Sequence, residues 1–429
     1  MTTVLEVANR VLADYMPVFF IAFAVSFVAT PLMRMLAVRH GIIDWPDMAR
    51  KSHVMPVAYL GGLAVCLAFT SGVFLFYLFP GAQAFIAAPS NAKHIVSIAF
   101  GAICVTLVGF FDDVYGISPR VKIGGQFLAA GVLAMSSQSL GTLFVMKLFS
   151  SLGLTIDLKI AYVLGAALIG LFVLVGCNSM NLLDGLDGLA AGVTTIACIG
   201  FLVIAIFAAA ERPTNIDPVR LVMCLALLGS LLGFLPYNFN PANIFLGDAG
   251  SLLLGYLCAA LILLFADQAS QGPSLGPRLV MAALVVFALP IADTALAIFR
   301  RKMRRQPIFC PDNQHMHHQL LRVLQNSGLS PGASVKLAVL AFYVVAALFG
   351  VLGGSLLYMR WRYAMAIFLP LFGFIVVSAY KLGQRQSLVA EAAALSHEAA
   401  GAEPPPATGQ QVVPVAGNQA ATVKGADPA

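Results

Sequence analysis

The stretch FLVIAIFAAA at residues 201–210 decides the class of fold, because no residue in it is polar. A second stretch, LVMAALVVFAL at residues 279–289, is equally apolar. Strands of a membrane β-barrel alternate polar and apolar side chains, whereas a transmembrane helix is apolar over about 20 residues. The two stretches therefore favour an α-helical membrane protein over a β-barrel.

The composition of the chain agrees with this class. Of the 429 residues, 60% are hydrophobic and 10% are charged, compared with roughly 45–50% apolar and 25% charged residues in a soluble domain. A soluble fold of this length could not bury so much apolar surface. The sequence predicts an all-α, polytopic integral membrane protein.

Eleven apolar segments are long enough to cross a bilayer. We expect spans at 16–38, 58–80, 94–111, 123–140, 160–177, 188–209, 220–236, 251–267, 279–299, 335–356 and 364–380. An outside N-terminus and a cytoplasmic C-terminus put most of the 25 Lys and Arg residues on the inner side, as the positive-inside rule favours. The net charge of +6 is therefore assigned to membrane orientation and not to binding of nucleic acid.

Two domains are expected. Residues 1–385 form the polytopic domain, and residues 386–429 are rich in Ala, Gln, Pro and Gly, with Glu-Pro-Pro-Pro at 403–406. Such a composition cannot bury enough apolar surface to offset the loss of chain entropy on folding. The second segment is predicted to be a disordered cytoplasmic tail.

The polar residues gather on one side of this topology. Five clusters follow odd-numbered spans, at 44–53, 110–113, 178–187, 237–251 and 300–318. An active site assembled from helix ends would show this pattern. We expect such a site at the cytoplasmic face.

Two of the clusters suggest a divalent metal. Asp112 and Asp113 end an apolar span, and adjacent carboxylates repel one another unless they share a cation; two solvated acids at a helix end are the alternative. The segment NSMNLLDGLDG places side-chain oxygens at steps of three, at Asn178, Asn181, Asp184 and Asp187, which are neighbouring positions on a helix before the glycines break it. Such oxygens suit Mg²⁺, although Asn and Asp beside Gly also form ordinary turns.

The segment Gly247-Asp248-Ala249-Gly250-Ser251 opens the eighth predicted span. Asp248 can cap the helix, or hold a metal that bridges a phosphate at the helix N-terminus, and both roles can coexist. The two glycines would let the backbone approach that phosphate closely.

His315, His317 and His318 follow a basic stretch that contains Arg301 and Arg304. A zinc site would need three or four ligands, and the sequence offers one nearby thiol, Cys310, without paired-cysteine spacing. Histidines that face phosphate beside a basic loop are favoured, with arginines at the membrane surface as the bland alternative.

These segments together resemble the polyprenyl-phosphate N-acetylhexosamine-1-phosphate transferase family, over nearly all of residues 16–380. The resemblance rests on Arg50-Lys51-Ser52-His53 with Gly61-Gly62 downstream, Phe111-Asp112-Asp113, and the segments 178–188, 245–251 and 311–318. The histidine loop is similar to the branch that uses UDP-N-acetylglucosamine to start cell-surface polysaccharides. Met316 and Gln319 depart from the peptidoglycan branch, whose loop has three consecutive histidines followed by an acid.

The resemblance implies a Mg²⁺-dependent reaction, with Mn²⁺ as an alternative ion, in which undecaprenyl phosphate attacks a UDP-sugar and UMP leaves. It implies Asp248 and, more weakly, Asn181 for the metal, and Asp112 and Asp113 for the lipid phosphate or its activation. Substrate contacts are expected at Lys51, His53, Asn178, Asp184, Asp187, Asn238, Arg301, Arg304, His315, His317 and His318. Among these, Asp184 and Asp187 are assigned to the nucleotide, and Asn238 to uracil or ribose on position alone.

The partners expected are a UDP-sugar, a polyprenyl phosphate and the inner membrane, with a homodimer as an open option. Three other functions stay open. A phospho-N-acetylmuramoyl-pentapeptide transferase belongs to the same family. A secondary transporter would place coupling residues near the midplane, where we expect only Asp293, after Pro290. An intramembrane aspartyl protease would need a partner acid for Gly247-Asp248, and a neighbouring span supplies none.

Overall fold

The computed structural model describes most of the helical part of the chain. The described residues are 2–45, 56–78, 89–136, 141–142, 145–146, 149–150, 153–211, 218–267, 276–303, 305, 315–359, 362–363, 366–370, 372–374, 377–378 and 381. The chain divides into two units, Met1–Gly383 and Gln384–Ala429, and every described residue belongs to the first. The predicted tail therefore lies outside the described residues.

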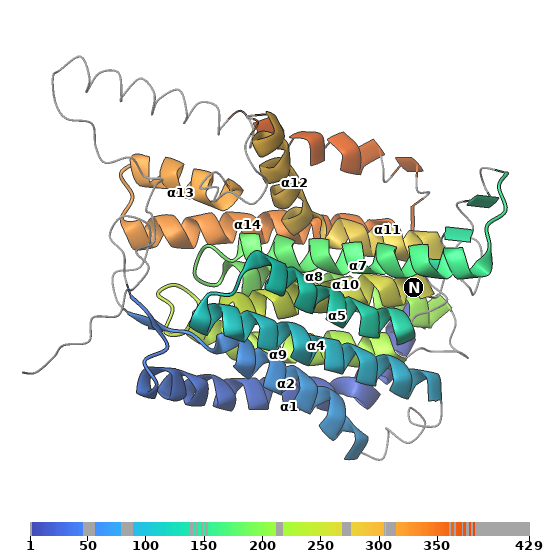
Figure 1. Ribbon diagram of the computed structural model, residues 1–429, viewed down its shortest axis with the longest axis horizontal. Helices are drawn as coiled ribbons and strands as arrows, with labels where there is room; N and C mark the ends of the chain where they lie inside the picture. Colours follow the sequence, from blue (N-terminus) through green and yellow to red (C-terminus); the bar gives the residue numbers. More distant parts are fainter. Residues whose placement is uncertain are drawn as a thin grey trace, which may run out of the picture. The chain divides into compact units, whose positions relative to one another are not determined.

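The described residues are mostly helical, as predicted (Figure 1). The helices are α1 (Thr2–Arg39), α2 (Gly61–Leu75), η1 (Phe76–Leu78), α4 (Pro89–Tyr115), α5 (Pro119–Ser136), α7 (Leu158–Leu183), α8 (Leu189–Glu211), α9 (Pro218–Asn238), α10 (Gly247–Asp267), α11 (Gly276–Val286), α12 (Ala288–Met303), α13 (Met316–Asn326) and α14 (Pro331–Ser355). Two short strands, β1 (Ile43–Asp44) and β2 (Val57–Ala58), pair antiparallel.

Within the described residues, seven helices are long and apolar enough to cross a membrane, and an eighth candidate is the bent pair α11 and α12. The protein is therefore a multi-pass membrane protein. Helix α2 is apolar but has only 15 residues, and the predicted span 364–380 is described only in short pieces. The predicted count of eleven spans is not confirmed.

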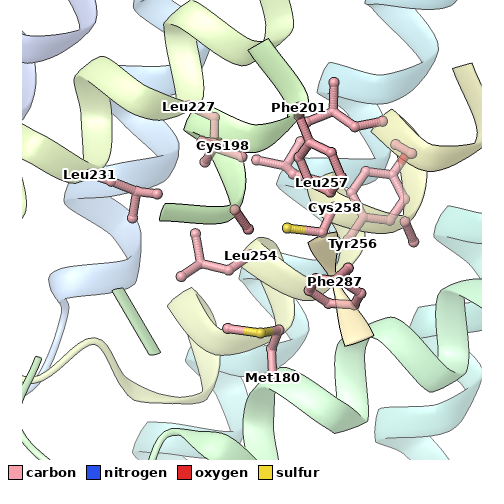
Figure 2. Packing of buried hydrophobic residues seen from close by; sticks show 14 of the residues in the cluster. Met180, Cys198, Phe201, Leu227, Leu231, Leu254, Tyr256, Leu257, Cys258 and Phe287 are labelled. Atoms are coloured by element: carbon pink, nitrogen blue, oxygen red, sulfur yellow. The ribbon is translucent and has the colours of Figure 1, made fainter. Parts of the chain in front are cut away.

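Helix α10 lies at the centre of the bundle, where it packs against α4 and α7. A β-carbon on Gly176 of α7 would lie 2.8 Å from the carbonyl oxygen of Gly255 of α10, so the missing side chains let these helices approach closely. Figure 2 shows part of the surrounding apolar core, which includes Met180, Cys198, Phe201, Leu227, Leu231, Leu254, Tyr256, Leu257, Cys258 and Phe287. A rigid core of this kind fixes the helix ends that carry polar residues.

The strands β1 and β2 join the end of α1 to the segment before α10. The amide of Phe245 donates to the carbonyl of Ala58 at 2.8 Å, and the amide of Gly62 donates to the carbonyl of Leu246 at 2.9 Å. A β-carbon on Gly62 would collide with the backbone of Gly250, so α2 begins directly against the first turn of α10. Backbone contacts thus hold the segment from β2 to the start of α2 against residues 245–250, which belong to the predicted cluster 237–251.

The helices α11 and α12 meet at a 67° bend. Pro290 lies in the first turn of α12, where its missing amide hydrogen costs no helical hydrogen bond. In Figure 1, α12 runs across the direction of the neighbouring long helices, and it packs against α7 and α14. The bend places Asp293 inside the protein, at 1% exposure.

Candidate active site

Four helix ends meet at one place. Helix α4 ends and α5 begins there, α7 ends there, and α10 begins there; α4 packs against α5 and α10, and α7 packs against α5 and α10. Side chains at these ends reach one another by hydrogen bonds. The structure thus brings together three predicted clusters, 110–113, 178–187 and 237–251.

Lys122, in the first turns of α5, lies at the centre of this site. Its Nζ donates to Oδ2 of Asp112 at 2.9 Å, to Oδ1 of Asn181 at 3.2 Å, and to Oδ2 of Asp248. Burial alone would lower the pKa of Lys122, but the carboxylates of Asp248 and Asp112 outweigh burial and hold this pKa above its ordinary value. Lys122 therefore stays positively charged and is held in place by its three partners. We call Asp112, Lys122, Asn181 and Asp248 the carboxylate cluster.

Asp248 is held through both of its carboxylate oxygens. Lys122 binds Oδ2, and Nδ2 of Asn181 donates to Oδ1 at 2.7 Å. The same Nδ2 donates to Oγ of Ser251 at 3.0 Å. Asp248 therefore points into the site and does not cap its own helix.

Asp113 is the cap of α10. Its Oδ1 accepts the amide hydrogen of Asp248 at 2.8 Å, and its Oδ2 accepts that of Ala249 at 3.0 Å. Gly247 has a φ of +70°, and a β-carbon there would lie 2.6 Å from Oδ2 of Asp113. The positive φ and the close contact with Asp113 explain why residue 247 is a glycine. Among the described residues, Asp112 binds Lys122 while Asp113 binds a helix N-terminus, and the sharing of a cation between the two acids stays a prediction.

The turn after α7 carries two acids with different surroundings. Helix α7 continues to Leu183, so the predicted placement of Asn178 and Asn181 on one helix is confirmed. Burial, and after it the charges of Asp248 and Asp113, raise the pKa of Asp184. The neighbouring Asp187 instead ties down the loop after α9, since its Oδ2 accepts from Asn240 Nδ2 at 2.8 Å and from the amide of Ala242 at 3.1 Å.

Two amides assigned to substrate make contacts within the protein. Asn178 donates to Oε1 of Gln126 and to the carbonyl of Leu174, both at 2.8 Å. Asn238 is 3% exposed and donates to the carbonyl of Ile244 at 3.0 Å. Asn238 therefore makes a structural contact, and its expected contact with uracil or ribose stays a prediction.

The histidines approach the same turn from α13. A β-carbon on Gly185 would collide with Nε2 of His317, so this ring lies directly against the turn. His317 is 1% exposed, and neither of its ring nitrogens has a hydrogen-bond partner among the described residues. Burial and the neighbouring His318 lower the pKa of His317 to about 3. His317 is therefore neutral at physiological pH.

The histidine segment, His315 to His318, is anchored by Asp293. Oδ2 of Asp293 lies 2.8 Å from Nδ1 of His315, and Oδ1 accepts the amide hydrogen of Met316 at 2.9 Å. Arg301, on the same helix α12, is 8% exposed. Within the described part of the chain, no group of three His, Cys, Asp or Glu residues is arranged to hold a metal.

Three predicted substrate contacts, Lys51, His53 and Arg304, lie outside the described residues. The structure does describe the base of the loop that holds Lys51 and His53, namely β1, β2 and Tyr59. Burial, and after it the neighbouring Asp44, raise the pKa of Tyr59, which also lies near the charges of Asp113 and Asp248. The β-strands therefore bring the base of this loop to the carboxylate cluster.

Sequence reasoning missed four residues of the site, namely Lys122, Gln126, Ser251 and Asp293. Lys122 was counted only as a positive charge on the inner side, and Asp293 only as a deep acid. The signal that could have singled out Lys122 is its position within the first turns of a helix, nine residues after Asp113 in a site otherwise made of acids and amides. Ser251 stands in the segment 247–251 without an expected role, and Gln126 and Asp293 have no local signal.

Comparison with known proteins agrees with this geometry. The family model described as "Glycosyl transferase family 4" matches residues 95–266. The "Probable undecaprenyl-phosphate N-acetylglucosaminyl 1-phosphate transferase" of Bacillus subtilis strain 168 is 32% identical over 335 residues, which is 77% of this chain and 83% of the relative.

Two further relatives extend the comparison. The "Decaprenyl-phosphate N-acetylglucosaminephosphotransferase" of Mycolicibacterium smegmatis is 32% identical over 340 residues, 75% of this chain and 76% of the relative. A "Phospho-N-acetylmuramoyl-pentapeptide-transferase" of Caldanaerobacter subterraneus is 34% identical over a shorter 261 residues, 58% of this chain and 75% of the relative. The similarity to relatives over most of their length shows that the chain belongs to the polyprenyl-phosphate N-acetylhexosamine-1-phosphate transferase family.

Proposed function

We propose that this chain transfers N-acetylglucosamine-1-phosphate from UDP-N-acetylglucosamine to a polyprenyl phosphate such as undecaprenyl phosphate, releasing UMP, as the first membrane step of cell-surface polysaccharide synthesis. The relatives matched over most of the chain carry names for this activity. The observation that carries the proposal is the carboxylate cluster, in which oxygens of Asp112, Asn181 and Asp248 gather around one cation.

The reaction needs alignment and charge neutralisation more than a strong base. An oxygen of the lipid phosphate forms a bond to the β-phosphorus, the bond from that phosphorus to the bridging oxygen breaks, and its electrons leave with UMP. Because the lipid phosphate is already an anion at neutral pH, Asp112 need not act as its base. Asp112 holds the ammonium of Lys122, which neutralises charge beside the reacting groups.

The donor set of the cluster fits a hard divalent cation. Mg²⁺ usually takes one or two protein carboxylates together with phosphate oxygens and water, and Asp248 with Asn181 would supply the protein ligands, with Mn²⁺ as the alternative ion. When bound, the ion would neutralise the diphosphate and polarise its phosphorus. The fit rests on oxygens of these two residues meeting at one cationic group, the ammonium of Lys122.

The remaining assignments complete the proposal. We assign Asp184 to the nucleotide, because it lies beside the cluster, and the histidines and basic residues near α12 to the diphosphate. The site is assigned to the cytoplasmic face of the plasma membrane, with the N-terminus outside and eleven spans, on the positive-inside rule. A homodimer is compatible with this arrangement.

A second candidate within the family is the transfer of phospho-N-acetylmuramoyl-pentapeptide. The Caldanaerobacter relative favours it, but the similarity covers a smaller share of this chain. The transporter and protease alternatives lose support, because Asp293 is bound to His315 and Met316, and Asp248 is bound to Lys122 and Asn181.

The test is release of UMP by purified protein in detergent with Mg²⁺, undecaprenyl phosphate and a panel of UDP-sugars. We expect UDP-N-acetylglucosamine to give the highest kcat/KM. A higher kcat/KM for UDP-N-acetylmuramoyl-pentapeptide would favour the second candidate. Release of UMP from no sugar nucleotide would refute both.

A further inference from the structure

Asp293 is a buried acid that the chemistry above leaves without a function. It lies in α12, a few residues beyond the 67° bend, and is 1% exposed. Burying a carboxylate is unfavourable unless its oxygens are well paired. The contacts that Asp293 makes therefore indicate why the fold retains it.

Both oxygens of Asp293 bind the start of the histidine segment. Oδ2 lies 2.8 Å from Nδ1 of His315, and Oδ1 accepts from the amide of Met316 at 2.9 Å. Met316 is the first residue of α13, and the side chain of His315 makes no cap hydrogen bond to this helix. Asp293 thus supplies from α12 the cap that α13 lacks, at the positive end of the helix dipole.

These bonds also orient the ring of His315. An ionised carboxylate only accepts hydrogen bonds, so Nδ1 of His315 carries the hydrogen and Nε2 is the nitrogen left for a further partner. The rings of His315 and His317 lie nearly parallel, with centroids 5.7 Å apart, and the His317 ring lies against Gly185. Asp293 therefore sets where the histidine segment meets the turn at 184–188.

We propose that Asp293 is a positioning residue that holds His315 so that its Nε2 faces the diphosphate of the sugar nucleotide. In the complex, the ring of His315 lies between Asp293, bound through Nδ1, and a phosphate oxygen, bound through Nε2. This inference rests on the proposed function and adds a residue from α12 to it. It predicts an effect on the sugar nucleotide and not on the lipid.

The test begins with Asp293→Asn, which keeps the size of the side chain and one acceptor for Met316. We expect kcat/KM for UDP-N-acetylglucosamine to fall at least about tenfold, as for other groups that orient a binding histidine. The KM for undecaprenyl phosphate and the melting temperature should stay near wild type. The matched control is Asp157→Asn, since Asp157 caps α7 by accepting from the amide of Lys159 at 2.8 Å, and it should change none of these values.

A double-mutant cycle separates positioning from a general structural effect. If Asp293 acts through His315, then Asp293→Asn in a His315→Gln background should lower kcat/KM by less than about twofold further, because coupled residues are not additive. If the two substitutions lower kcat/KM independently, so that their fold-changes multiply in the double mutant, the proposal is contradicted. A structural role alone would lower the melting temperature and leave the two substitutions independent.

The remaining outcomes each support or overturn either the positioning role or the proposed function. If Asp293→Asn melts below the assay temperature, His315→Gln alone carries the test, because it leaves the bond from Asp293 to Met316 in place; an unchanged KM for UDP-N-acetylglucosamine would overturn the proposal. If the wild-type protein releases UMP and the Asp293→Asn variant has the same kinetics, only the positioning role is overturned. Wild-type protein that releases no UMP overturns the proposed function, and the positioning role with it.

Discussion

Beside the carboxylate cluster and at the histidine segment, a helix begins where an acid from another helix accepts one or two of its first amide hydrogens. Asp113 of α4 binds the start of α10, and Asp293 of α12 binds the start of α13. The surroundings differ. Beside Asp113 lie the carboxylates of Asp248 and Asp112, whereas beside Asp293 lie histidines, one of which, His317, is neutral.

This difference separates the two tasks of the site. The carboxylate cluster concentrates charge, which suits a cation and the reacting phosphates. In the histidine segment, the buried rings of His315 and His317 lie nearly parallel, which suits positioning of a substrate group. In both regions, the acid that caps the helix is distinct from the residue that we propose to face the substrate.

The largest effect is expected for Asp248→Asn, which removes a charge from the carboxylate cluster and leaves the cap of α10 intact. Turnover should fall by about 10²–10³-fold, the range for loss of one charge-stabilising group. The melting temperature should stay near wild type, because Asp113 still binds the backbone. UMP release and thermal melting in detergent measure the two quantities. Near wild-type turnover would remove Asp248 from the reaction centre.

Lys122→Met tests whether the centre needs its fixed cation. Asp112 and Asp248 would face each other without a counter-charge, so we expect turnover to fall about 100-fold and the unfolding free energy to fall by about 1–3 kcal/mol. Lys159→Met, at the exposed start of α7, is the matched control and should leave both unchanged. Full activity in Lys122→Met would mean that this lysine only neutralises charge in the absence of substrate.

Asp113→Asn tests the assignment of Asp113 as a cap. Asparagine has one side-chain acceptor, so one of the two amides of α10 loses its partner, and we expect a loss of about 0.5–2 kcal/mol in unfolding free energy. Turnover should fall by much less than in Asp248→Asn. The reverse order, with a stable but inactive Asp113→Asn, would show that Asp113 contacts substrate and would break the comparison.

The smallest expected effect is a pH dependence that arises in the histidine segment. The pKa of His317 is about 3 in the fold and 6.5 in the unfolded chain, so between these values the unfolded chain binds the extra proton and stability falls as pH falls. From pH 7.5 to pH 6 this loss is about 0.8 kcal/mol. His317→Gln should lack it, so the difference between the two melting curves isolates this histidine. Parallel curves would contradict the assignment.

What the sequence predicts well is local. Apolar runs predicted the long helices, and the steps of three from Asn178 predicted that Asn181 shares its helix, because both signals lie within one element. Gly188 follows as a turn residue, with a φ of +78°. The family motifs also led to Asp248.

What the sequence does not predict is contact between distant elements. Lys122 lies 59 residues from Asn181 and 126 residues from Asp248, and no local pattern reports their distance in space. Asp113 stands beside Asp112 in the chain, yet the structure gives them different partners. The contact of the buried Asn238 with the carbonyl of Ile244 has no signal in the sequence either.

The measurement that tests the central claim most directly is the balance of products from wild type and Asp248→Asn. Each protein is incubated with Mg²⁺, UDP-N-acetylglucosamine and undecaprenyl phosphate, and UMP and the lipid-linked N-acetylglucosamine diphosphate are quantified by mass spectrometry. The account predicts equal amounts of both products from wild type, none without Mg²⁺, and almost none from a folded Asp248→Asn. Lipid product formed at the wild-type rate by Asp248→Asn, or UMP released without lipid product, would contradict it.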